Sequence, residues 1–238
     1  MNSKSLSLLV LSTAMVALSA CGAHTETPLT QVDIAIERAE KHAAAIQDPD
    51  KKLAVYERIY KQNPKSAKAA TEYARHLRKQ GRVAQAESIM TLFAEMPENP
   101  SFVYAEFAAI KLANGEHASA EIYAKEALAQ KEDDSFAYHT LGIALDGLGR
   151  YKEAEEAFRS ALEIWDGNPV PVMNNLALNL ATQGYIDEAI STLERAKTLE
   201  PSRTELERNL RIIRALNENS AAYFPDQRVP HPTKKPSN

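Results

Sequence analysis

The sequence predicts an all-α solenoid, a stack of antiparallel helix pairs, and two observations carry that prediction. Glycine is scarce, with eight residues in 238, and the strong helix formers Ala, Leu, Glu, Lys and Arg dominate. Small residues recur at the length of one helix pair: Ala86, Ala120, Ala154 and Ala189 are spaced by 34, 34 and 35 residues. An unrelated helical bundle does not explain this period. One pair cannot bury its apolar face alone, so the copies must stack.

Residues 1–20 have the features of a secretory signal peptide. Lys4 places a positive charge near the N-terminus, and residues 6–18 are apolar. Ser19 and Ala20 precede Cys21, the single cysteine. The apolar run is shorter than the roughly 20 residues that a membrane-spanning helix needs. One interpretation is cleavage near Ala20 with an incidental cysteine.

The tetrapeptide Leu18-Ser19-Ala20-Cys21 resembles the bacterial lipobox. That resemblance implies that Cys21 is lipidated and becomes the first residue of the mature chain, with residues 21–28 as a polar tether. More than one acyl chain gives stable anchoring. Gly22 stands where inner-membrane lipoproteins usually have Asp. The resemblance therefore implies a lipid anchor in the outer membrane, with the protein facing the periplasm.

The predicted solenoid spans residues 29–219. A degenerate N-terminal pair, with its first helix over 30–46, ends at Asn63-Pro64. Four clear pairs follow, the first three over 67–100, 101–134 and 135–168. The glycines expected to end their first helices in the left-handed conformation are Gly81, Gly115, Gly149 and Gly184. Residues 202–219 are apolar on one face and charged on the other, as expected for a C-terminal capping helix. Residues 220–238 carry four prolines and are expected to be a disordered or extended tail.

The best copy, 135–168, resembles the tetratricopeptide repeat. Its first helix carries Leu141, Gly142 and Leu145, and its second carries Ala154 and Phe158. The resemblance implies a right-handed superhelix whose first helices line a concave groove for a protein segment. By that resemblance, the partner-binding residues of the groove are Arg75, Phe102, Phe136, His139, Asn174, Asn175 and Leu178.

The expected groove runs from a basic end to an apolar, partly polar end. Asn174 and Asn175 could hydrogen-bond the backbone of a bound peptide, or they could serve helix-start or inter-repeat bonding. A chaperone-type carboxylate clamp is not expected, because His139 and Ile143 stand where its first Lys and Asn would be. Phe102 and Phe136 favour a partner peptide with apolar anchors.

The sequence gives no convincing catalytic or metal-ligating constellation. The six histidines lack metal-ligand spacing, and neither a Gly-rich phosphate loop nor a GxSxG serine is present. A net charge of −4 gives no electrostatic reason to expect nucleic acid. We therefore expect a binding protein that is not an enzyme, with no cofactor, no metal and no small-molecule substrate.

The stretch LGIALDGLGRYKEAEEAF, followed by NNLALNLATQGYIDEAI, resembles the TadD-type lipoprotein of the Tad (Flp) pilus assembly machinery. The resemblance is specific over residues 135–210. It implies a pilotin-like adaptor that supports assembly or localisation of the outer-membrane secretin. The alternative is a periplasmic scaffold of another envelope machine, such as a type IV pilus pilotin or a peptidoglycan-machinery adaptor.

Overall fold

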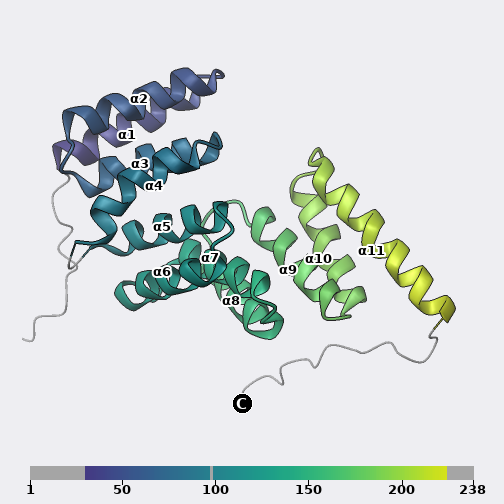
Figure 1. Cartoon of the computed structure of the whole chain (residues 1–238). Helices are drawn as coiled ribbons and strands as arrows, with labels where there is room; N and C mark the ends of the chain where they lie inside the picture. The colour runs from purple at the N-terminus through teal and green to yellow at the C-terminus, as the bar shows by residue number, and fades with distance from the viewer. Residues whose placement is uncertain (1–29, 97–98, 224–238) are drawn as a thin grey trace, which may run out of the picture.

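The computed structural model describes residues 30–96 and 99–223, which form eleven α-helices and no strand. The helices are α1 Gln31–Ala44, α2 Pro49–Gln62, α3 Ala67–Lys79, α4 Val83–Ala94, α5 Ser101–Ala113, α6 His117–Gln130, α7 Ser135–Gly147, α8 Tyr151–Glu163, α9 Val170–Thr182, α10 Ile186–Leu199 and α11 Thr204–Tyr223. They form five pairs, stacked in chain order and followed by α11 (Figure 1). The predicted all-α solenoid is confirmed, with α1 and α2 as the degenerate pair.

The four predicted glycine turns are present. Gly81, Gly115, Gly149 and Gly184 have φ angles between 75° and 87° and follow α3, α5, α7 and α9. A residue with a Cβ is strained in this left-handed region, whereas glycine adopts it freely. Each turn sends the chain back along the helix that it has just left, which closes the pair.

The two helices of a pair approach closely at small residues. A Cβ built on Gly142 of α7 would lie 2.5 Å from Cε1 of Phe158 in α8, so only glycine fits beneath that ring. Ala154 and Ala161 of α8 are fully buried, and Phe158 is 1% exposed. The ring of Phe158 therefore packs within its own helix pair, against Gly142 of α7.

The core is continuous along the stack. One cluster of buried apolar side chains runs from Ile36 in α1 to Ile110 in α5, and a second runs from Ala108 in α5 to Ile213 in α11. Tyr123 of α6 packs against both clusters, and its ring meets Phe107 edge-on at 4.6 Å between centroids. Neighbouring pairs thus share side chains, as a stack of incomplete units requires.

The stack curves with the odd-numbered helices on the inner side. Each odd-numbered helix packs directly on the next odd-numbered one, from α1 to α11. In the described part of the chain, no two even-numbered helices pack on each other in this way. Long side chains bridge that wider outer gap instead, as in the 2.7 Å ion pair between Arg159 of α8 and Glu188 of α10. The odd-numbered helices therefore form the concave face.

Polar contacts also join successive odd-numbered helices, between residues 33 to 36 positions apart. With donor–acceptor distances of 2.5 to 2.9 Å, these contacts are Asp33–Lys68, His139–Asn175, Asp146–Asn179 and Asn174–Asn209. The separation is close to one repeat, so the period that aligns the core residues also aligns these polar partners.

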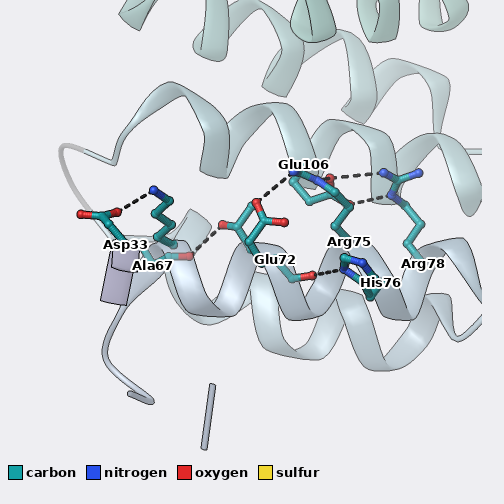
Figure 2. A network of polar contacts seen from close by, with 9 residues as sticks. Asp33, Ala67, Glu72, Arg75, His76, Arg78 and Glu106 are labelled. Carbon is teal, nitrogen blue, oxygen red and sulfur yellow. Dashed lines mark hydrogen bonds and ion pairs between the residues drawn. The ribbon is translucent and has the colours of Figure 1, made fainter. Parts of the chain in front are cut away.

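The most buried of these contacts is an ion network between α3 and α5 (Figure 2). Glu106 of α5 is 0% exposed and accepts from Arg78 Nε at 2.7 Å, Arg78 Nη2 at 3.2 Å and Arg75 Nε at 3.1 Å. Arg75 also donates through Nη1 to Glu72, at 2.9 Å. A buried carboxylate requires such partners, because its desolvation is costly when it is unpaired.

Two sequence expectations concern the ends of the chain. Helix α11 continues to Tyr223 and so includes residues 220–223, which the sequence pattern places in the tail. Ala221 and Ala222 favour helix, and Pro225 follows only two residues beyond its end. The signal peptide, the tether with Cys21 and residues 224–238 lie outside the described residues. Among the described helices, none combines the length and the apolar character needed to cross a bilayer.

Replacing Gly142 with Ala tests the close contact of α7 and α8. Helix propensity alone favours Ala by about 1 kcal/mol, so an open site would be stabilised. Because the added methyl group would clash with Phe158, we expect Ala to destabilise the protein instead. The free energy of unfolding should fall by about 1–3 kcal/mol in urea denaturation. Combining Gly142→Ala with Phe158→Leu should cost less than the two single changes added together. A Gly142→Ala protein more stable than the wild type would contradict the packing.

Replacing Glu106 with Gln tests the buried ion network. The change keeps the shape of the side chain but removes the carboxylate that pairs with Arg78 and one of the two carboxylates that pair with Arg75. We expect a loss of about 2–4 kcal/mol in the free energy of unfolding. The matched control is Glu37→Gln in the exposed Glu37–Lys41 pair, which should leave the stability nearly unchanged. Equal effects of the two changes would refute a structural role for Glu106.

Candidate functional site

The concave face carries a hollow with a volume of about 490 Å³. It lies across α3, α5 and the start of α7, and the loop between α8 and α9 closes its far side. The residues that line it are Arg75, Arg78, Lys79, Phe102, Ala105, Asp134, Ser135, Phe136, Trp165, Asp166, Gly167 and Asn168. We call this feature the concave hollow.

One wall of the concave hollow is formed by the cations of α3. Glu72 and Glu106 hold the guanidinium groups of Arg75 and Arg78 in place (Figure 2). Burial favours the neutral form of Arg75, but the two carboxylates outweigh it and raise the pKa of Arg75. Burial also raises the pKa of Glu72. Lys79, the next cation, has no ion-pair partner among the described residues.

Aromatic rings form the floor and the opposite wall. Phe102 and Phe136 lie in the first turns of α5 and α7, and Trp165 lies in the loop between α8 and α9; all three are half-buried. Phe102 packs on the first core cluster, while Phe136 packs on Ala105 and Ala137. The rings are thus anchored by the solenoid core and leave part of their surface free for a ligand.

Three of the seven predicted groove residues meet in the concave hollow: Arg75, Phe102 and Phe136. His139 and Asn175 lie beside it and bind one another, with 2.9 Å between His139 Nε2 and Asn175 Nδ2. The ring of His139 also meets Trp165 edge-on, at 5.6 Å between centroids. Burial lowers the pKa of His139 to about 4, so this ring is neutral at pH 7.

The structure uses Asn174 to join helices. Asn174 is 4% exposed; its Oδ1 accepts from Asn209 at 2.8 Å and its Nδ2 donates to Glu205 at 3.3 Å, both in α11. Of the two roles left open by the sequence, this is inter-repeat bonding. Leu178 of α9 is 40% exposed and does not line the concave hollow.

Sequence reasoning missed Glu72, Glu106 and Trp165. The first two are separated by 34 residues, so they occupy equivalent positions in successive copies of the repeat. Aligning the copies at this position would have revealed the acidic pair. Its effect is electrostatic, because the end of the groove expected to be basic is largely neutralised by these carboxylates. Trp165 lies in a turn where the repeat pattern gives no signal.

The arrangement suits binding. It presents rings, guanidinium groups and one free ammonium on an open concave surface. Across residues 30–96 and 99–223, His, Asp and Glu side chains do not gather in threes as a metal site requires. The features of this surface that can recognise a ligand are its shape, its apolar area and its charge.

The comparisons agree with the repeat pattern. Family models of the tetratricopeptide repeat match residues 41–95, 135–164 and 170–203, which together make up half of the chain. A search of curated proteins finds no match.

Solved structures of similar fold include two tetratricopeptide-repeat proteins and one protein complex. TTC0263, a protein of Thermus thermophilus, aligns with a TM-score of 0.64 at 21% identity, over 77% of this chain and 99% of that one. The APC/C hetero-tetramer Cut9–Hcn1 aligns with a TM-score of 0.66 at 14% identity, over 83% of this chain and 44% of that one. YrrB, a repeat protein with an unusual peptide-binding site, aligns with a TM-score of 0.50 at 18% identity, over 73% of this chain and 89% of that one. With the stacked pairs and the matched repeats, this shows that the chain belongs to the tetratricopeptide-repeat family of protein–protein interaction scaffolds.

Proposed function

We propose that this chain is a lipid-anchored adaptor on the periplasmic side of the outer membrane. It holds a segment of the secretin of a Tad (Flp) pilus machine in the concave hollow and so helps to assemble or localise that channel. The observation that carries the proposal is the concave hollow itself, where aromatic rings from two helices and a loop face the fixed cations of α3.

Binding of a protein segment is supported by the form of this surface. Three successive odd-numbered helices contribute to it, so an extended or helical peptide laid along the groove contacts several repeats at once. YrrB, which shares the fold, has a peptide-binding site. Arg75 and Arg78 are already ordered by Glu106, which reduces the entropy lost when a partner binds.

Membrane anchoring is supported by the sequence that precedes the solenoid. Leu18-Ser19-Ala20-Cys21 has the lipobox pattern, and residues 22–28 give a short polar spacer before α1. Anchoring raises the effective concentration of the concave hollow near a membrane-embedded partner without any new contact. The assignment to the Tad system rests on the resemblance over residues 135–210.

Cys21→Ser tests the anchor. The variant cannot accept a diacylglycerol at the thiol, so it should move from the membrane pellet to the soluble periplasmic fraction. Fractionation followed by immunoblotting measures the distribution, and mass spectrometry of the wild type should find acyl groups on an N-terminal Cys21. A variant that stays in the pellet with the wild type would show that the anchor is wrongly assigned.

Asp166→Tyr tests the concave hollow as the secretin site. Asp166 is exposed on its rim, so a tyrosine there obstructs the opening without changing the core. Affinity capture of the full-length protein from membranes should recover the secretin with the wild type and lose most of it with Asp166→Tyr. Asp187→Tyr, exposed at the start of α10 and away from the hollow, is the matched control and should behave as the wild type. Unchanged secretin multimers after gene deletion would reject the adaptor role.

A further inference from the structure

We infer that the segment held in the concave hollow carries an aromatic side chain next to a single acidic residue. This inference rests on the proposed function, because it names the chemistry of whatever occupies the same hollow. Two features on opposite sides of the hollow carry it: the cluster of rings, and a cation excess confined to one wall.

The rings specify the anchor. Phe102, Phe136 and Trp165 come from three separate elements and line one cavity of about 490 Å³. Partly buried rings converging on an open hollow offer stacking and edge-to-face contacts, which an aromatic guest uses better than a small side chain does. The ring of His139 meets Trp165 edge-on, at 5.6 Å between centroids, and so helps to fix the position of the indole ring.

The charges on α3 specify the acidic neighbour. Arg75, Arg78 and Lys79 face the hollow, while Glu72 and Glu106 balance two of these three cations. The ion pairs engage Nε and Nη1 of Arg75, and Nε and Nη2 of Arg78. Among the described residues, Nη2 of Arg75, Nη1 of Arg78 and the Lys79 ammonium are left as donors. One carboxylate of a guest would neutralise the excess charge and accept these hydrogen bonds.

The opposite rim limits the guest to one acidic residue. Asp134 accepts from the Ala137 N–H at 3.0 Å and from Ser101 Oγ at 3.1 Å, so it is engaged in capping α7. Asp166 is exposed on the same rim. A second carboxylate on that side would meet these two like charges, which disfavours an acidic run across the hollow. The acidic residue therefore lies towards α3.

Trp165 gives a direct test, because it is the single tryptophan of the chain. Its emission in the full-length protein reports titration with two blocked hexapeptides, Ac-Gly-Ser-Phe-Asp-Ser-Gly-amide and Ac-Gly-Ser-Asp-Phe-Ser-Gly-amide. We expect at least one of them to bind about fivefold or more tightly than its Asn counterpart, and replacing Phe with Ala should abolish binding.

Charge reversal provides the decisive comparison. Lys79→Glu should weaken binding of the acidic peptide about fivefold or more. It should strengthen binding of the peptide that has Lys in place of Asp. Lys65→Glu, in the exposed turn between α2 and α3, is the matched control and should keep the wild-type order of affinities. Thermal melts should match for all three proteins. Three results would overturn the inference. They are equal affinity for the Asp and Asn peptides, no binding of either acidic peptide, and an order of peptide affinities that Lys79→Glu leaves unchanged.

An array of random dodecamer peptides distinguishes failure of this inference from failure of the proposed function. Ligands lost on Asp166→Tyr but lacking an aromatic–acidic pair overturn only the present inference. An array on which the wild-type protein binds nothing overturns the proposed function as well. Enrichment of ligands with one acidic residue beside a ring supports both.

Discussion

The architecture depends on small side chains at the points where helices contact each other. Gly142 admits the ring of Phe158 only because it has no Cβ, and Ala86, Ala120 and Ala154 are fully buried at repeat-spaced positions. Small residues let the helices of a pair approach until their larger neighbours interlock. The apolar area of one pair is still too small for independent stability, so each pair needs the next. The long curved stack follows from that local constraint.

Much of the fold could be predicted because the signals are local and repeated. A glycine with positive φ and a small residue at a fixed offset define each pair without reference to the rest of the chain, and Gly149 with Ala154 is one example. The concave hollow was only partly predictable. Whether Arg75 faces a ligand or Glu106 depends on how two neighbouring pairs are rotated against each other, and no single copy encodes that rotation. Asn174 illustrates the same limit, since its partner Asn209 lies 35 residues away.

Glu106 links stability to ligand recognition. Burying a carboxylate beneath two arginines gives little net stability, because desolvation offsets most of the Coulomb attraction. Its structural effect is to fix two guanidinium groups at the edge of the concave hollow before any partner arrives. The same contact joins α3 to α5, so the positions of these cations and the angle between two repeats are set together.

The loop that carries Trp165 occupies the one place where the repeat lengthens, since Ala154 and Ala189 are 35 residues apart instead of 34. Its two ends are fixed by α8 and α9, while its middle borders the concave hollow. Insertions and substitutions in such a loop are tolerated far better than changes inside a helix. Homologues can therefore diverge in what they recognise through this short connection alone, while their scaffolds remain superimposable.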